Sequence, residues 1–376
     1  MIPRTYLQSL IEEIQSNRKI IILFGPRQVG KTTLAGEVLK NLSLKSLKIN
    51  ADQTRFVNIL GSRDLEKMLT LVEGFELLFI DEAQRIPDIG INLKILHDNL
   101  PNLKILVTGS SAFELANRTR EALTGRTLTY ILYPISVKEL RTLSSPFQLQ
   151  EQVENYLIYG MYPEIISLKN NQKKVRYLRE LVSAYLYKDI LELANLKHAD
   201  KLTNLLKLIA FQVGSQVSLT ELGQQLGMAK ETVESYLDLL EKSFVIFRLR
   251  GFSRNLRKEV TKMSKYYFYD LGVRNAVIEN FNPLYLRNDM GQLWENFLLI
   301  ERRKKQAYEF SAANRYFWRT YTQQEIDYVE ESGGNLAGYG FKYTKARVSP
   351  PQSWTEAYPQ ATFEVISPEN FLNFII

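Results

Sequence analysis

Nine residues near the N-terminus have the types and the spacing of a loop that binds phosphate groups. An apolar run at 20–24 leads into the pattern G-x-x-x-x-G-K-T, and a helix-compatible segment follows. In such a loop two glycines let the backbone turn its N–H groups inward, the lysine reaches the β- and γ-phosphates, and the threonine hydroxyl binds Mg²⁺. The flanking strand and helix favour a nucleoside triphosphate site over an ordinary tight turn. The residues of this expected site are Gly25, Pro26, Gln28, Val29, Gly30, Lys31, Thr32 and Thr33.

Asp81 and Glu82 form an acidic pair directly after another apolar run, at 77–80. An acidic pair after a strand is usually a solvated turn. Here it follows Lys31 by 50 positions, which leaves room for an intervening strand and favours a catalytic pair. Asp81 would hold Mg²⁺ together with Thr32, and Glu82 would orient and deprotonate the attacking water. The pair therefore predicts hydrolysis of the bound nucleotide.

Hydroxyl side chains stand at the end of a further apolar run, at 104–108. Thr108 and Ser110 would lie at the carboxyl end of this strand, where ligands of parallel sheets bind. A hydroxyl at this edge can bond the γ-phosphate or the attacking water. The same residues are equally suited to cap a following helix, and the two roles are compatible.

Three arginines follow this run, namely Arg118, Arg120 and Arg126. A guanidinium suits the charge that develops on the γ-phosphate, although most surface arginines have no catalytic role. Arg126 is the preferred candidate because it follows a glycine and precedes a strand-like run. It would act on the nucleotide of its own chain or of a neighbouring copy, so the sequence is compatible with a homo-oligomer.

The elements that must position these residues are strands alternating with helical segments. Most of the strand-like runs are rich in Ile, Leu, Val and Phe, as expected for strands covered on both faces. This alternation predicts the α/β class, with a parallel sheet and helices on its faces. The five runs are 19–24, 46–50, 76–80, 104–108 and 127–132.

The composition limits the class of protein. A chain of 376 residues is expected to hold two or three domains, and a net charge of +7 permits but does not require a nucleic-acid partner. The absence of cysteine excludes disulfides, iron–sulfur clusters and thiol catalysis. The first 18 residues lack the apolar core of a signal peptide, and no apolar run is long enough to cross a bilayer. We expect a cytoplasmic protein without a membrane partner.

Several of these motifs together resemble one group of prokaryotic AAA-type ATPases. The resemblance implies ATP as the nucleotide, which agrees with the absence of an obvious guanine-specific N-K-x-D pattern. It also implies four parts: an ATPase core at 1–136, a helical lid at 137–207, a winged helix-turn-helix at 208–289 and a restriction-endonuclease-like domain at 290–376. The segments that carry it are 25–33, 79–84, 108–111, 123–126, 133–136, 139–140, 159–163 and 187–190.

The expected lid shows apolar residues at helical spacing, at 151–159 and 175–193. Such helices would suit a cover over the nucleotide. Arg176, Arg179 and Lys188 are candidates for reaching a phosphate from this side. The alternative is that all three are ordinary solvated charges on helices.

A helix-turn-helix is expected from 218 to 242. Ser218 and Glu221 have the spacing of a capping box that opens the first helix, Gly227 and Met228 make the turn, and the second helix spans 229–242. A strand-like run at 244–250 and the loop after it would form a basic wing at 248–258. The wing carries Arg248, Arg250, Arg254, Arg257 and Lys258.

Duplex DNA is the expected partner of this module, with the wing on the phosphates. The second helix carries four acidic residues that would repel phosphates, so backbone contact through the wing is favoured over base recognition. The alternative is a winged helix used for packing or for contact with another protein. The four acidic residues are Glu231, Glu234, Asp238 and Glu241.

The last part has the order helix, three strands, helix, strand that resembles restriction-endonuclease-like domains. Their metal-dependent chemistry needs an acid on one strand and E-x-K on the next. Asp327 fits the first acid and Lys342 fits the lysine, but Gly340 stands where the second acid belongs. Glu295 and Glu325 are weak substitutes, so we expect a degenerate domain rather than a nuclease. The expected helix is 292–304, and the expected strands are 316–320, 325–330, 336–343 and 362–366.

The sequence thus predicts Mg²⁺-dependent hydrolysis of ATP whose nucleotide state shifts the lid and, through it, the winged helix. Three alternatives stay open. They are an ATP-gated DNA-binding switch with slow hydrolysis, a nuclease regulated by ATP, and an NTP-dependent protein scaffold that does not bind DNA.

Overall fold

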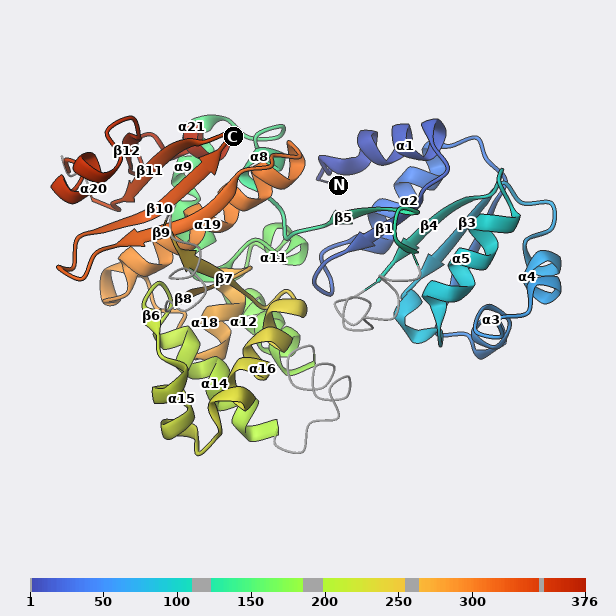
Figure 1. Cartoon of the computed structure of the whole chain (residues 1–376), viewed down its shortest axis with the longest axis horizontal. Coiled ribbons are helices and arrows are strands. Elements are labelled where there is room, and N and C mark those ends of the chain that lie inside the picture. The colour runs from blue at the N-terminus through green and yellow to red at the C-terminus, as the bar shows by residue number, and fades with distance from the viewer. Residues whose placement is uncertain (1, 110–122, 185–198, 254–263, 345–347) are drawn as a thin grey trace. The chain divides into compact units, whose positions relative to one another are not determined.

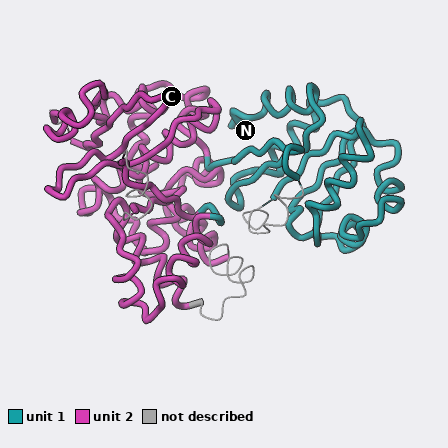
Figure 2. The backbone as a smooth tube through the Cα atoms, viewed as in Figure 1, with its two compact units in different colours: residues 1–134, 242–244 teal, residues 135–241, 245–376 magenta. Residues whose placement is uncertain are grey.

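The computed structural model describes residues 2–109, 123–184, 199–253, 264–344 and 348–376. The chain divides into two compact units, which are described separately (Figure 2). The N-terminal unit comprises 1–134 with 242–244, and the C-terminal unit comprises 135–241 with 245–376. None of the helices in the described ranges is both long and apolar enough to cross a lipid bilayer.

The N-terminal unit is built on a five-stranded sheet in the order β2-β3-β4-β1-β5, and every neighbouring pair is parallel. All five residues of β1 are buried, as the continuous apolar run requires. The predicted α/β class is confirmed, and each predicted run matches a strand to within one residue at either end. The strands are β1 (Ile20–Phe24), β2 (Ser46–Asn50), β3 (Leu77–Asp81), β4 (Lys104–Thr108) and β5 (Thr127–Ile131).

Helices cover both faces of this sheet, with α1 and α2 on one face and α4 and α5 on the other (Figure 1). The connection from β1 to β2 moves one way along the sheet, and the connections from β2 to β3 and from β3 to β4 move the other way. Because all of these crossovers are right-handed, their helices lie on opposite faces. The carboxyl ends of β1, β3 and β4 meet at one edge. The helices are α1 (Tyr6–Ser16), α2 (Lys31–Asn41), α3 (Thr54–Leu60), α4 (Leu65–Val72), the 3-10 helix η1 (Ala83–Arg85) and α5 (Ile89–Asn99).

The C-terminal unit combines helices with a seven-stranded mixed sheet in the order β12-β11-β10-β9-β7-β8-β6 (Figure 1). Its strands are β6 (Gln216–Val217), β7 (Ile246–Gly251), β8 (Ser264–Phe268), β9 (Asn314–Arg319), β10 (Glu325–Ser332), β11 (Asn335–Phe341) and β12 (Thr362–Ile366). Its helices are α8 (Val137–Leu140), α9 (Pro146–Glu151), α10 (Val153–Tyr159), α11 (Pro163–Ser167), α12 (Asn171–Leu181), α14 (Ala199–Phe211), α15 (Leu219–Leu226), α16 (Lys230–Lys242), α18 (Leu271–Val277), η3 (Leu284–Leu286), α19 (Met290–Tyr308), α20 (Gln352–Ala357) and α21 (Phe371–Ile375).

A single sheet runs through the two ranges that the sequence suggests as separate domains, 208–289 and 290–376. The link is the parallel pairing of β7 with β9, in which Arg250 lies opposite Tyr316 and Gly251 opposite Phe317. The backbone N–H of Phe252 continues the ladder with a 2.6 Å bond to the carbonyl of Phe317. The two ranges therefore share backbone hydrogen bonds as well as side-chain contacts.

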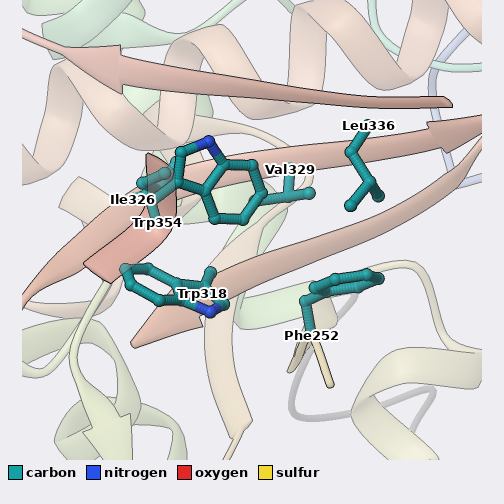
Figure 3. Packing of buried hydrophobic residues seen from close by; sticks show 6 residues of the cluster. All are labelled: Phe252, Trp318, Ile326, Val329, Leu336 and Trp354. Atoms are coloured by element: carbon teal, nitrogen blue, oxygen red, sulfur yellow. The ribbon is translucent and has the colours of Figure 1, made fainter. Parts of the chain in front are cut away.

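The core beneath this junction also draws on both ranges (Figure 3). Phe252, which follows β7, packs among side chains from β9, β10, β11 and α20. Within the cluster the rings of Trp318 and Trp354 meet edge to face, with centroids 5.3 Å apart. Truncating a buried ring in such a cluster costs roughly 3–5 kcal/mol, so the junction is part of the stable core. The cluster contains Phe252, Trp318, Ile326, Val329, Leu336 and Trp354.

Candidate functional site

The predicted phosphate-binding loop connects β1 to α2. Gly25 and Gly30 have φ angles of +145° and +94°, which favour glycine. A Cβ at position 25 would lie 2.1 Å from the carbonyl oxygen of Leu132, so a larger residue would displace that backbone. Helix α2 begins at Lys31, directly after Gly30. The first N–H groups of this helix have no partner inside it, which suits them to phosphate oxygens.

Lys31 lies inside the loop and is only 4% exposed. Its Nζ donates hydrogen bonds to the carbonyl oxygens of Gly25 (2.9 Å) and Pro26 (2.8 Å). Burial lowers the pKa of Lys31 to about 8, although Glu82 and Asp81 pull it in the opposite direction. A desolvated ammonium in this position is stabilised by further negative charge, which phosphate oxygens would supply.

Asp81 brings the ends of two strands and the start of a helix together. The hydroxyl of Thr32 donates to its carboxylate at 2.9 and 3.1 Å. Thr108, which is fully buried, also donates its hydroxyl to Asp81 and accepts a 3.3 Å bond from the backbone N–H of Glu82. Hydroxyl and carboxylate oxygens are the ligands that Mg²⁺ prefers, so Thr32 and Asp81 fit such an ion. The hydrogen bond from Thr108 fixes the position of the Asp81 carboxylate.

Glu82 has a left-handed backbone, with φ +54°, between β3 and η1. Such a conformation is costly for a residue other than glycine and is common at functional sites. Its Oε2 accepts a 2.5 Å bond from the side-chain amide of Gln84. Gln84 belongs to the acidic motif but was given no role from the sequence. Its position two residues after Glu82 suits it to orient that carboxylate.

The other predicted loop residues lie in the turn or in the first turn of α2. Val29 is fully buried beneath the loop, and Gln28 has φ +60°. Pro26 contributes the carbonyl that Lys31 binds. Thr33 lies exposed in the first turn of α2. The structure therefore brings the whole predicted loop together with Asp81, Glu82 and Thr108 at the carboxyl edge of the sheet.

Arg126 lies at the opposite edge of the sheet, which favours the neighbouring-copy alternative over a role on the nucleotide of its own chain. It immediately precedes β5, whose first residue, Thr127, pairs with Ile20 at the start of β1. The loop begins a whole strand further on, about 13 Å away at 3.3 Å per residue. The Arg126 guanidinium instead makes a two-pronged ion pair with Asp98, at 2.8 and 3.1 Å. These hydrogen bonds lower the pKa of Asp98 to about 2.

Three predicted residues of this region, Ser110, Arg118 and Arg120, lie outside the described residues. Their proposed contacts with the γ-phosphate stay predictions.

Three ranges of the chain match family models. Residues 17–141 match the family model described as "AAA domain". This match covers most of the N-terminal unit, which is called the AAA domain below. Residues 150–284 match "Domain of unknown function (DUF8612)", and residues 290–365 match "Domain of unknown function (DUF4143)". The match of residues 17–141 supports ATP binding and hydrolysis in general.

Two uncharacterized relatives match most of this chain. An uncharacterized protein of Mycobacterium tuberculosis is 27% identical over 329 residues, which cover 86% of this chain and 70% of the relative. An uncharacterized protein of Haemophilus influenzae is 26% identical over 316 residues, which cover 79% of this chain and 77% of the relative. Among solved structures, a Walker-type ATPase of Pyrococcus abyssi has a TM-score of 0.49 and 15% identity, covering 74% of this chain and 96% of that one.

Arg4 supports the loop of the AAA domain and was missed from the sequence. Its Nη1 donates to the carbonyl of Val29 and its Nη2 to that of Tyr133, both at 2.7 Å. The first contact spans 25 residues and the second 129, so no local pattern marks this arginine. Arg4 therefore ties the loop to the segment that follows β5.

Replacing Arg4 with alanine is expected to lower the free energy of unfolding by about 1–3 kcal/mol, because two part-buried carbonyls lose a charged donor. Nucleotide affinity should fall several-fold as the loop loses its support. Chemical denaturation and a nucleotide titration measure the two effects. Arg18→Ala is the matched control, since Arg18 makes one exposed 3.1 Å bond to the carbonyl of His97. Equal behaviour of the two variants would contradict a role for Arg4.

A second cluster of polar residues lies in the C-terminal unit, around a cavity of about 590 Å³. The structure brings Glu295, Glu325, Asp327 and Lys342 together there, with Gly340 in the wall. Lys265 of β8 also lines this cavity, and no sequence pattern indicates it. In the described ranges no three acidic or histidine side chains are arranged to ligate one metal ion.

The motif at 159–163 has a structural explanation. Gly160 has φ +73°, and a Cβ there would lie 2.0 Å from Oδ1 of Asp270. Asp270 is buried and accepts a 2.7 Å bond from the backbone N–H of Met161 and a 3.2 Å bond from that of Val273. Burial raises the pKa of Asp270 to about 6. The motif thus serves to dock the chain after α10 on the N-terminus of α18.

Three of the charged residues predicted to meet nucleic acid or phosphate are paired with carboxylates. Arg248 donates its backbone N–H to Glu241 at 2.7 Å, and their side chains lie 3.4 Å apart. Arg176 pairs with Glu180 at 2.8 Å and Arg179 with Glu279 at 2.6 Å, which favours the solvated-charge alternative for both. Lys188, Arg254, Arg257 and Lys258 lie outside the described residues.

Proposed function

We propose that this chain is a Mg²⁺-dependent ATPase whose AAA domain controls the binding properties of the C-terminal unit. The observation that supports it best is the meeting of Thr32, Asp81 and Thr108 at the loop, beside Glu82. In this hydroxyl–carboxylate cluster Thr108 is buried and Thr32 is exposed, and the cluster stands where a metal-bound triphosphate would lie.

Each residue of the site would have a separate role in hydrolysis. Lys31 and the N–H groups of the loop would bind the β- and γ-phosphates. Thr32 and Asp81 would hold Mg²⁺, which supplies neutralisation of the phosphate charge when bound. Glu82 would accept a proton from water as the water oxygen bonds to the γ-phosphorus and the bond to ADP breaks, releasing phosphate. Thr108 is buried against Asp81, which favours a positioning role over direct contact with the γ-phosphate.

An additional arginine for the γ-phosphate would come from a second copy of the chain or from another arginine of this one. Arg126 is compatible with the first of these roles only, because it lies at the far edge of its own sheet. An assembled ring or dimer of the AAA domain would be the simplest way to bring an arginine to this edge.

We further propose that the 208–289 region is a winged helix that contacts the DNA backbone. The order α14, β6, α15, α16, β7, β8 supports it, as does the left-handed turn at Gly227 between α15 and α16. Ser218 caps α15 by accepting the backbone N–H of Glu221 at 3.3 Å. The exposed positions of α16 include Glu231, Glu234 and Asp238, which disfavours insertion of this helix into a groove.

The same acidic face favours a second candidate, in which the C-terminal unit binds another protein instead of DNA. A DNA-independent scaffold would use the exposed carboxylates of α16 against a basic partner. The third alternative, a nuclease, is disfavoured by Gly340 and by the paired state of the carboxylates around it.

ATP turnover measured with and without duplex DNA tests the proposal and separates its candidates. We expect phosphate release that stops when EDTA removes Mg²⁺ and that rises severalfold with random duplex at low salt. Retardation of the same duplex in a gel should weaken as salt is raised, because phosphate contacts release counterions. Turnover unaffected by DNA, together with no retardation at either salt concentration, would favour the protein scaffold. Absence of any turnover would contradict the ATPase itself.

A further inference from the structure

The cavity of the C-terminal unit has an unusual occupant, the side chain of Lys265. This residue lies on β8, opposite Leu249 of β7 and Gln216 of β6, and is only 3% exposed. Its Nζ lies 2.5 Å from Oε1 of Glu325 and 3.4 Å from Oε1 of Glu295. One ammonium thus lies between carboxylates from α19 and β10.

The pKa of Lys265 reflects this position. Burial lowers it, but the attraction of Glu295 and Glu325 outweighs burial and raises the pKa above its usual value. Lys265 is therefore charged at neutral pH. A buried ammonium of this kind behaves as a fixed monovalent cation, because its removal would leave the facing carboxylates uncompensated.

Each of the three acids also has a protein partner other than Lys265. Tyr267, two residues after Lys265 on the same strand, donates its hydroxyl to Oε1 of Glu295 at 2.5 Å. Asp327 accepts a 2.7 Å bond from the backbone N–H of Phe341. Glu325 also lies 3.4 Å from a guanidinium nitrogen of Arg319. Each acid in the cavity is therefore bonded to a protein donor.

Position 340, where an acid would complete a metal site, has little room for one. A Cβ on Gly340 would lie 3.1 Å from the ring of Phe363, which is tighter than most Cβ contacts. The neighbouring strand β12 carries Phe363 opposite Gly338 of β11. The packing of β11 on β12 and the position of Lys265 therefore both disfavour binding of a divalent ion in this cavity.

We propose that the ammonium of Lys265 is the resident cation of this cavity and takes the place of a divalent metal ion among Glu295, Glu325 and Asp327. The cavity then needs no metal ion. Its cation comes from β8 in the matched region 150–284, and its three acids come from the matched region 290–365. This inference does not depend on ATP hydrolysis by the AAA domain.

Binding of Mn²⁺ to the nucleotide-free full chain, followed by electron paramagnetic resonance, tests the proposal. We expect Asp327→Asn to bind Mn²⁺ as the wild type does, because the cavity holds no divalent ion in either. Any contribution of Asp81 is common to both proteins and cancels in the comparison. Mn²⁺ binding by the wild type that Asp327→Asn abolishes would overturn the proposal.

Replacing Lys265 with methionine removes the charge while keeping most of the side-chain volume. We expect this variant to bind Mn²⁺ about ten-fold more tightly than the wild type, and Asp327→Asn in the same background to remove the gain. Lys342→Met is the matched control, since it removes the other lysine of the cavity and should give a smaller gain or none. A folded Lys265→Met variant with wild-type Mn²⁺ affinity would refute the proposal. If the variant does not fold, the comparison of wild type with Asp327→Asn still decides.

Discussion

Replacing Glu82 with glutamine is expected to leave ATP binding intact and to lower the turnover number by about a hundred-fold or more. Glutamine has nearly the same shape, and its side-chain oxygen can still accept the hydrogen bond that Gln84 donates to Glu82. The backbone N–H of residue 82 keeps its bond to Thr108. What is lost is the base that takes the proton from water, and a positioned base contributes 10²–10⁴-fold.

Steady-state phosphate release and an ATP titration by calorimetry separate the two effects. Glu66→Gln is the matched control, because Glu66 is an exposed glutamate of the same domain in the first turn of α4. It should turn over ATP as the wild type does. Full activity of the Glu82→Gln variant would remove Glu82 from the mechanism and leave the identity of the base open.

Replacing Lys31 with alanine is expected to weaken ATP binding by about a hundred-fold or more. The ammonium would make charge-assisted hydrogen bonds to phosphate, each worth roughly 1.5–3 kcal/mol. The same change removes the bonds that Lys31 makes to the carbonyls of Gly25 and Pro26, so the loop loses internal support as well. Binding and turnover should therefore fall together, in contrast to the Glu82→Gln variant.

Calorimetry with a non-hydrolysable ATP analogue measures the affinity, and thermal unfolding shows whether the domain is still folded. Lys40→Ala offers a control on the same helix, because Lys40 is 71% exposed and pairs only with Glu37 in the described contacts. Its affinity should match the wild type. If Lys31→Ala binds ATP as tightly as Lys40→Ala, nucleotide binding at this loop is excluded.

The core of the nucleotide site could be predicted because its parts are local or follow one simple rule. The loop lies between a strand and a helix that are adjacent in sequence, so the short segment 25–30 between them determines its geometry. Asp81 and Thr108 each end an apolar strand, and parallel strands place such ends at one edge. The same rule places a residue before a strand at the other edge. For Arg126, which precedes β5, the rule disfavours contact with the nucleotide of its own chain.

The C-terminal unit could be predicted in its elements but not in its connections. The strands at 325–330 and 362–366 and the helix around Glu295 occur close to where periodicity put them. The pairing of β7 with β9 joins segments more than sixty residues apart, and nothing in either strand specifies its partner. The boundary between 289 and 290 that the resemblance implies therefore passes through a continuous sheet.

The sequence alone determined the strand-loop-helix of the AAA domain, the acidic pair and the order of the C-terminal elements, because these follow from short-range spacing and hydrophobic periodicity. Only the tertiary structure decided that Arg4 contacts the loop, that Arg126 pairs with Asp98 and that Lys265 lies among Glu295 and Glu325. Each of these contacts is made by a single long side chain or strand edge whose partner is distant in the chain. Such a partner is selected by the packing of whole elements, which no local pattern encodes.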